Sequence, residues 1–271
     1  MPIITKVSSQ KRPGRYNIFL DGQYAFSASE QTVAEFMLLK GQELNLNELT
    51  AVKKFDVCSK ATALASNYLS YQARTVYEVL QYLQKHGIED EAAQNAVSQL
   101  SAMGFLDDRK YVTLSIKQSL RSGTDGPLTL TRKLTQKGID PAIVQEELAE
   151  VADEDWLDTG LRVLKSLKSQ VGKVSERELN RKMNSKLLSH GFSSGIASLV
   201  VEEADMRPDS DAQVEALKKQ GVKAYKRFRR LPESERERKI RNYLFTHGFA
   251  SNEIDAFLAG EIIPLDELAE Y

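Results

Sequence analysis

A six-residue stretch that recurs four times decides the fold of this chain, and its first copy reads Leu83-Gln84-Lys85-His86-Gly87-Ile88. The later copies occupy residues 134–139, 187–192 and 244–249 and read LTQKGI, LLSHGF and LFTHGF. Their glycines, at positions 87, 138, 191 and 248, are separated by 51, 53 and 57 residues. Self-similarity at such a period is typical of repeat proteins, so we expect tandem copies of one helical unit.

Each copy has the composition of a helix end followed by a new helix start. A glycine just past a helix adopts the left-handed conformation that other residues resist. Residues with capping chemistry then precede the next helix, namely Asp90, Asp140 followed by Pro141, Ser193 and Ser251. Upstream, capping boxes of the form Ser/Thr-x-x-Glu begin at Thr75, Ser175 and Ser234, whereas the second copy has Gly126-Pro127.

A further helix is expected before each pair, over residues 107–120, 156–167 and 213–230 in the last three copies. The predicted fold class is therefore mainly α, with tandem three-helix repeats that form an elongated curved array. A small antiparallel β segment is expected at the N-terminus. Residues 3–10, 15–20 and 20–27 resemble strands joined by tight turns at Pro13-Gly14 and Asp21-Gly22. So small a sheet must pack on a helical part of the chain.

These patterns predict six segments. They are a β meander with a short helix (1–45), four repeats (46–105, 106–152, 153–206 and 207–260) and a loosely attached tail (261–271).

Composition limits the classes of function. The 271 residues are 41% hydrophobic with a formal net charge of -1, so a nucleic-acid-binding role would need a local basic patch. Cys58 is the only cysteine, and the sequence contains no signal peptide and no apolar stretch of about 18 residues. We therefore expect a cytoplasmic protein that does not insert into a membrane.

The three histidines, His86, His190 and His247, each precede a repeat glycine. A metal or acid-base site is one interpretation. The better one is a helix-end residue near the last carbonyls, because Lys137 takes the same place in the second copy. The adjacent carboxylates Asp107 and Asp108 are interpreted as helix caps. With no zinc spacing and no phosphate-binding loop, we expect no enzyme activity, no catalytic residue, no metal and no cofactor.

One segment is strongly basic. Residues 222–241 contain nine basic and three acidic residues, a net charge of +6. Helical spacing places Lys223, Lys226, Arg227 and Arg230 on one face and Val222, Tyr225 and Phe228 on the opposite one. A solvated helix face and a surface for phosphates or an acidic protein both remain open. The candidate DNA- or partner-binding residues are Lys223, Lys226, Arg227, Arg229, Arg230, Arg236, Arg238 and Arg241, with Arg74, Arg109 and Lys110 near the first two copies.

Several of these motifs resemble the RecX family. The similar segments are RTxxEVxxYLxxxG at 74–87, LxxxGFLDDxxY at 100–111, Gly126-Pro127 with LxxKGI at 134–139, and YLxxxGF at 243–249. The leading β segment and the extra repeat resemble the long form found in low-GC Gram-positive bacteria. Val112 stands where the family usually has alanine.

The resemblance implies a regulator of the RecA recombinase. Such a protein would bind the RecA–single-stranded DNA filament groove and mainly inhibit filament growth, ATP hydrolysis and strand exchange in DNA repair and the damage (SOS) response. The implied partners are the RecA filament and, weakly, single-stranded DNA, with the protein acting as a monomer. From the residues alone, a helix-turn-helix-like DNA-binding regulator and a general helical-repeat scaffold remain alternatives.

Overall fold

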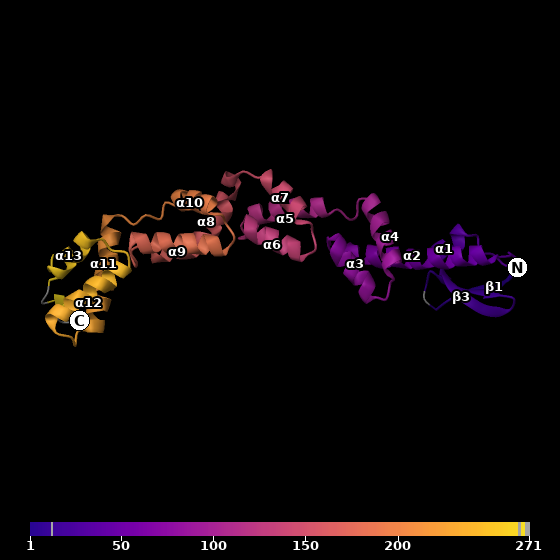
Figure 1. The fold of residues 1–271 in the computed structure, drawn as a ribbon, viewed down its shortest axis with the longest axis horizontal. Helices are drawn as coiled ribbons and strands as arrows, with labels where there is room; N and C mark the ends of the chain where they lie inside the picture. The colour runs from indigo at the N-terminus through magenta and orange to yellow at the C-terminus, as the bar shows by residue number, and fades with distance from the viewer. Residues whose placement is uncertain (12, 265–266, 269–271) are drawn as a thin grey trace. The chain divides into compact units, whose positions relative to one another are not determined.

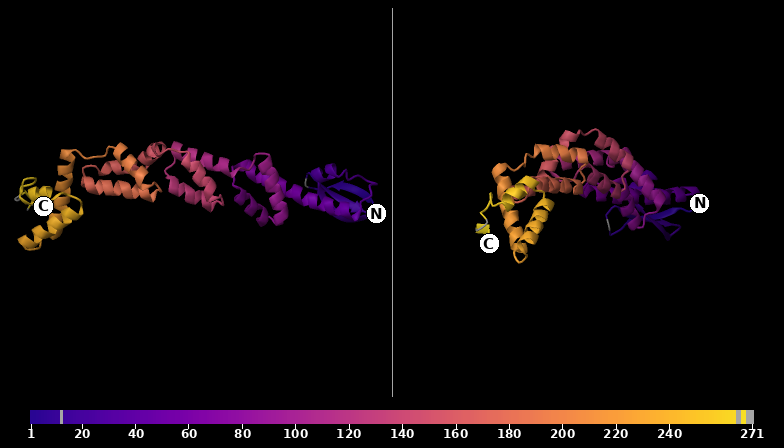
Figure 2. Two further views of the ribbon diagram at one scale, coloured as in Figure 1. Left: turned by 45° about the horizontal axis from the view of Figure 1, so that its top comes forward. Right: turned by 60° about the vertical axis from the view of Figure 1, so that its left-hand side comes forward.

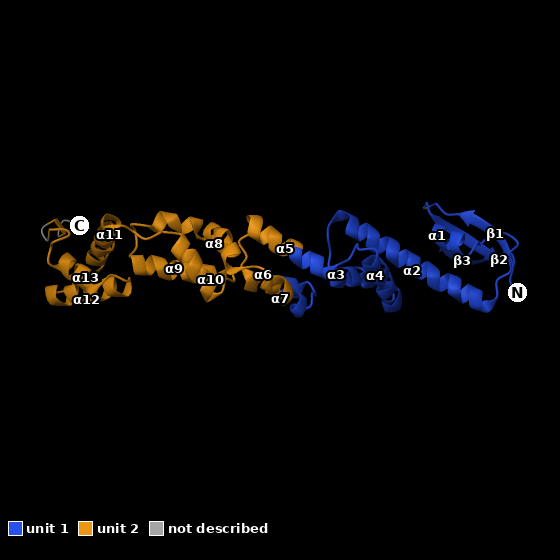
Figure 3. Ribbon diagram, turned by 90° about the horizontal axis from the view of Figure 1, so that it is seen from above, with its two compact units in different colours: residues 1–113, 134–144 blue, residues 114–133, 145–271 orange. Residues whose placement is uncertain are grey.

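The computed structural model describes residues 1–11, 13–264 and 267–268, and it is mainly α-helical, as predicted. Three strands open the described chain, and thirteen α-helices and two short 3-10 helices follow them (Figure 1). The chain divides into two units, residues 1–113 with 134–144 and residues 114–133 with 145–271 (Figure 3). The curvature and elongation of the array stay a prediction.

The predicted N-terminal meander is present. Strands β1 (Ile4–Ser9), β2 (Arg15–Leu20) and β3 (Gln23–Ser29) pair antiparallel in the order β1-β2-β3. A short helix, α1 (Glu30–Glu35), follows, and the long helix α2 (Leu46–Tyr71) packs against α1 and β3. The core between sheet and helix contains Ile4, Ile18 and Val52, each fully buried. The sheet is thus stabilised by a helical partner, as so small a sheet requires.

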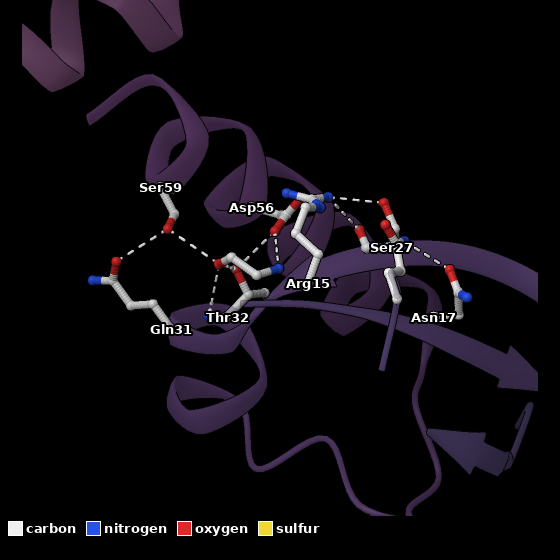
Figure 4. A network of polar contacts seen from close by, with 9 residues as sticks. Arg15, Asn17, Ser27, Gln31, Thr32, Asp56 and Ser59 are labelled. Atoms are coloured by element: carbon white, nitrogen blue, oxygen red, sulfur yellow. Dashed lines mark hydrogen bonds and ion pairs between the residues drawn. The ribbon is translucent and has the colours of Figure 1, made fainter. Parts of the chain in front are cut away.

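A buried carboxylate fastens the sheet to α2 (Figure 4). Asp56 of α2 accepts hydrogen bonds from Arg15 Nη2 at 2.9 Å, from the Ser29 backbone N–H at 2.6 Å and from Thr32 Oγ1 at 3.0 Å. The side chain of Arg15 also donates to Ser27 Oγ at 2.8 Å. Because a buried charge is costly unless it is paired, this network fixes the position of the sheet on the helix.

The first helical triple consists of α2, α3 (Val76–Lys85) and α4 (Asp90–Ala102), which pack against one another in the first unit. Its core includes Ala65, Val79, Leu83, Val97 and Leu100. The second triple consists of α5 (Asp108–Ser122), α6 (Pro127–Gln136) and α7 (Pro141–Ala149), whose residues are shared between the two units.

Two more triples lie in the second unit (Figure 3), and their helices are labelled in Figure 1 and drawn from two further sides in Figure 2. The third consists of α8 (Leu157–Leu164), a 3-10 helix (Lys165–Gln170), α9 (Glu176–Ser189) and α10 (Ser194–Glu203). The fourth consists of α11 (Ser210–Phe228), α12 (Glu233–Thr246) and α13 (Ser251–Leu258). Within each, the three α-helices contact one another. Ile263 and Leu268, which belong to the predicted tail, are buried in the core of the fourth triple. The rest of the tail lies partly outside the described residues, and the segment boundaries stay a prediction.

All four repeat glycines have positive φ, between 73° and 88°. Gly87, Gly191 and Gly248 directly follow the C-cap residues of their helices. Three of these turns also rest against the start of an earlier helix. Thr75 Oγ1, before α3, donates to the Lys137 carbonyl at 2.7 Å, and Ser175 Oγ, before α9, donates to the His247 carbonyl at 2.5 Å. At α6 the donor is the backbone, because the Gly126 N–H bonds to the His190 carbonyl at 2.8 Å. We call these three contacts the turn joints.

Several predicted caps are confirmed. Thr75 forms both halves of its capping box with Glu78, Ser193 caps α10, and Asp140 precedes Pro141 and accepts from the Ala142 N–H at 2.9 Å. At Ser175 only one half of the predicted capping box is present, because Ser175 Oγ accepts from the Glu178 N–H while the Glu178 carboxylate pairs with Arg181.

Other predicted caps are wrong. The capping box at Ser234 does not form, because α12 begins one residue earlier, at Glu233 after Pro232. That start places Glu233 and Glu235 in the first turn, where the helix dipole favours negative charge. Asp90 and Ser251 are the first residues of their helices, and Glu89 and Ala250 occupy the N-cap positions.

Candidate functional site

The basic segment of the fourth triple folds as a helical hairpin in which α11 and α12 are joined by residues 229–232. Val222, Tyr225 and Phe228 pack on the buried core formed by residues such as Leu217 and Leu244. Since those side chains face inward, the cations that alternate with them on α11 face outward, as the helical spacing predicted. The α11–α12 basic surface comprises Lys223, Lys226, Arg227, Arg229, Arg230, Arg236, Arg238 and Arg241.

Three arginines of this surface are held by neighbouring groups. The Arg236 guanidinium lies over the Tyr225 ring at 5.2 Å from its centroid, and Arg227 lies over the Phe228 ring at 5.4 Å. Arg241 pairs with Asp255 of α13 at 2.5 Å. Arginine stacked on an aromatic face is pre-ordered and keeps its N–H donors available at the edge of the guanidinium.

The remaining cations extend into solvent. Lys223, Lys226, Arg229, Arg230 and Arg238 are exposed. Among the side chains that the structure describes, Arg229, Arg230 and Arg238 form no ion pair. Arg229 and Arg230 directly follow α11, where positive charge is also favourable to the helix dipole. The hairpin therefore joins stacked or paired arginines and exposed cations on one surface, an arrangement suited to phosphates or carboxylates.

Arg74, Arg109 and Lys110 belong to the first unit, and the eight residues of the α11–α12 basic surface belong to the second. Arg74 is half-buried over the Tyr68 ring at 4.4 Å, and that ring is stacked on Tyr82 at 4.0 Å. Arg109 and Lys110 are exposed in the first turn of α5. The structure thus divides the candidate residues into two groups on separate units.

The neighbourhood of Arg74 contains a charged cluster that the sequence did not reveal. Lys137 Nζ lies 2.6 Å from Glu78 Oε1, next to the turn joint at Thr75. Partial burial raises the pKa of Glu78, but the hydrogen bonds from Lys137 and from the Thr75 N–H and the nearby positive charges outweigh it, so the net pKa is lowered. The hydrogen bond to Glu78 raises the pKa of Lys137. This pair stabilises the joint in its charged form.

Asp107 and Asp108 are helix caps, as predicted. Asp107 Oδ1 accepts from the Lys110 N–H at 2.9 Å, which caps its own helix. Asp108 Oδ1 accepts from the Val76 N–H at 2.9 Å, which satisfies the start of α3. Burial raises the pKa of Asp108, with a further contribution from the negative charges of Asp107 and Glu78. The second contact links helices 32 residues apart, so no local pattern could have predicted it.

The three histidines occupy the C-cap positions of α3, α9 and α12. The Nδ1 atoms of His86 and His247 lie 2.8 and 2.6 Å from the carbonyl oxygens of Tyr82 and Tyr243, four residues back on the same helix. His190 instead contacts the Thr124 carbonyl at 2.9 Å, before α6. The helix-end interpretation is confirmed, and within the described ranges no group of three potential ligands could hold a metal ion.

Comparisons with known proteins agree with these features. Family models match three segments, namely the regulatory protein RecX N-terminal domain at residues 2–45, the RecX first three-helix domain at 61–100 and the RecX third three-helix domain at 211–258. A "Regulatory protein RecX" from Lactobacillus gasseri is 52% identical over 271 residues, which is 100% of both chains. The chain belongs to the RecX family.

The family relationship includes less similar sequences and solved structures. A RecX protein from Bacillus licheniformis is 34% identical, with 95% of this chain and 98% of that protein aligned. A crystal structure described as regulatory protein RecX matches with a TM-score of 0.63 and 29% identity, covering 74% of this chain and 100% of its own. RecX from Lactobacillus salivarius matches with a TM-score of 0.53 and 28% identity, covering 56% and 98%. In the part of the chain that the structure describes, no helix combines the length and the hydrophobicity needed to cross a bilayer.

Proposed function

We propose that this RecX protein regulates a RecA recombinase by binding the groove of the RecA–single-stranded DNA filament. It limits filament growth, and so reduces ATP hydrolysis and strand exchange during DNA repair and the damage response. The observation that carries this proposal is the 52% identity over the whole chain to a regulatory protein RecX. On this proposal the protein works in the cytoplasm as a monomer and has no catalytic activity of its own.

The architecture supports such a role. Neighbouring triples contact one another through the turn joints, and repeat proteins in general bind partners with surfaces that several repeats share. The α11–α12 basic surface offers cations to the filament, where DNA phosphates and acidic protein side chains both carry negative charge.

RecA-catalysed ATP hydrolysis on single-stranded DNA tests the proposal directly. With RecA from the same organism, stoichiometric amounts of the protein should lower the steady-state hydrolysis rate and slow strand exchange. An unchanged rate in both assays would contradict the proposal. Binding to the assembled filament but not to free RecA would separate it from a general scaffold, and sequence-selective duplex binding at physiological salt would favour the helix-turn-helix alternative.

Charge reversal can locate the contact. The variant Arg229→Glu/Arg230→Glu removes two exposed cations of the α11–α12 basic surface. The matched control, Lys117→Glu/Arg121→Glu, changes the net charge equally at two exposed cations of α5 in the same unit. If the α11–α12 basic surface binds the filament, only the first variant should need several-fold more protein to inhibit hydrolysis. Equal loss in both variants would indicate a general effect of net charge and not a contact.

A further inference from the structure

The third triple carries an open hollow that the sequence analysis did not single out. It has a volume of about 530 Å³ and lies along α9 beside the 3-10 helix, which contributes Leu167. From α9 it is lined by Glu178, Arg181, Lys182, Ser185, Lys186 and Ser189. All of these α9 side chains carry a polar or charged group.

Helical spacing explains why these six side chains line one hollow. They occur at positions i, i+3, i+4, i+7, i+8 and i+11 of α9, which form a single stripe along the helix. The opposite stripe, which contains Leu179, Met183 and Leu187, is buried in the core. At 1.5 Å per residue the polar stripe is about 16 Å long, which is enough to follow several consecutive phosphates of a nucleic-acid strand.

The hollow is positively charged. Its three cations face one carboxylate, Glu178, which pairs with Arg181 at 2.5 Å and lies 3.8 Å from Lys182. Lys182 Nζ also donates to Gln170 Oε1 at 2.8 Å, and Lys186 Nζ donates to Ser166 Oγ. These contacts hold both lysines against the 3-10 helix. Because an ammonium group has three N–H donors, each lysine keeps donors for an anion.

We propose that this hollow binds the phosphodiester backbone of a nucleic-acid strand. Ammonium, guanidinium and hydroxyl groups are the donors that contact phosphates and position a protein on a strand without reading its sequence. An acidic protein surface is the less suitable occupant, because the residues that dominate protein interfaces are buried Trp, Tyr and Arg side chains. The lining contains no aromatic residue among those that the structure describes, and Arg181 is exposed. Leu167, the one apolar side chain among the lining residues that the structure describes, is only 8% exposed.

The inference deepens the proposed function by naming where DNA binds. It concerns residues outside the three segments that the family models match, which are 2–45, 61–100 and 211–258.

The test uses the full chain without RecA. Binding of a fluorescent 30-nucleotide oligo(dT) is followed by anisotropy between 50 and 200 mM salt for the wild type and for Lys182→Gln/Lys186→Gln. Loss of two phosphate contacts should lower the slope of log K against log[salt] by about 1.4 for a single strand. The matched control is Lys117→Gln/Arg121→Gln, two exposed cations with the same i, i+4 spacing on α5, and it should retain the wild-type slope.

The outcomes separate the alternatives. The same titration with duplex DNA shows whether the hollow prefers single-stranded or double-stranded DNA. The inference is supported if the Lys182/Lys186 variant loses binding to either probe and the control variant does not. Wild-type protein that fails to bind either probe at 50 mM salt would overturn it. DNA binding by the Lys182/Lys186 variant that equals wild-type binding would also overturn it. If that variant bound DNA normally but no longer affected RecA, the occupant of the hollow would be an acidic protein surface.

Two further measurements distinguish a lost phosphate site from misfolding and from failure of the RecA proposal. Thermal melting of each variant shows whether it is folded. If the wild-type protein leaves RecA activity unchanged while the oligonucleotide results are as expected, the RecA proposal fails and the phosphate site stands.

Discussion

The turns at Gly87 and Gly191 have the same signature and nearly the same backbone, with φ of 73° and 87°, but different surroundings. A Cβ added at Gly87 would meet nothing within 4 Å. A Cβ added at Gly191 would lie 2.3 Å from Thr129 Oγ1 and 2.4 Å from the Thr129 backbone nitrogen, at the start of α6. The first glycine is required by conformation alone. The second is required by conformation and by a turn joint.

The turn joints also differ from one another in their donor. At α3 and α9 a side-chain hydroxyl, from Thr75 or Ser175, bonds to the carbonyl of the turn. At α6 the N–H groups of Gly126 and Leu128 bond to the carbonyls of His190 and Gly191 at 2.8 and 3.0 Å. Gly126 is needed there because a Cβ would lie 2.6 Å from the backbone of Gly191. The second repeat therefore lacks the capping box and gains a closer backbone contact.

The largest effect is expected from Gly191→Ala. Left-handed backbone costs an L-residue about 1–2 kcal/mol, and forcing a methyl group into a packed contact costs about 1–3 kcal/mol more. Gly87→Ala should lose only the first amount. Urea denaturation followed by circular dichroism measures both, and equal losses would show that the joint at Gly191 contributes nothing.

A smaller loss is expected from Gly126→Ala, where no positive φ is involved and only the close approach to Gly191 opposes the methyl group. We expect a loss of about 1–3 kcal/mol in the free energy of unfolding. Gly195→Ala is the control, because Gly195 lies in α10 and a Cβ there would meet only Ser193 Oγ at 3.8 Å. That change should raise stability by about 0.5–1 kcal/mol. A neutral Gly126→Ala would contradict the backbone joint.

Thr75→Val should cost about 1–2 kcal/mol, because it removes both the cap on the Glu78 N–H and the donor to the Lys137 carbonyl. Thr75→Ser keeps the hydroxyl and should stay within about 0.5 kcal/mol of the wild type. Denaturation midpoints of the three proteins check this. If the serine variant lost as much as the valine variant, packing of the threonine methyl group would explain the effect and not the hydrogen bonds.

The smallest effect concerns pH. The folded-state pKa of Glu78 is lowered, so its contribution to stability is fully present above the ordinary glutamate value of about 4.3 and is lost as the pH falls through the lowered pKa. The stability difference between the wild type and Glu78→Gln should therefore shrink on acidification from pH 5 towards pH 3. Asp108 has the opposite shift, so its stabilising contribution is present at low pH and lost as the pH rises. A difference that grew on acidification would contradict the assignment to Glu78.

Local patterns were enough to predict the glycine turns that follow the helices, the meander and the outward cations of α11, because each depends on residues a few positions apart. The glycine turns were predictable because the residue after the helix C-cap adopts a left-handed backbone, which glycine favours. Lys223 faces outward because Tyr225 and Phe228, on the opposite face of α11, pack on the core. The start of α12 was misjudged, since Ser234 matches a capping pattern but the N-cap position is taken by Pro232, two residues earlier.

Features that depend on tertiary contacts could not be predicted from the sequence. Asp108 caps a helix that begins 32 residues earlier, and Lys137 pairs with Glu78 across 59 residues. The hollow on α9 could have been suspected from the spacing of Lys182 and Lys186. Its second wall, however, is a 3-10 helix that holds those lysines through Ser166 and Gln170, and the sequence indicated only an ordinary helix there.

The turn joints have an evolutionary consequence. Each joint combines a hydrogen-bond donor at the start of one helix with the glycine turn that ends a helix of the next triple. Neighbouring triples therefore meet through the same pair of elements each time. A gene can then gain or lose a segment of about fifty codons without redesigning the remaining contacts, because stability in such arrays depends on nearest neighbours.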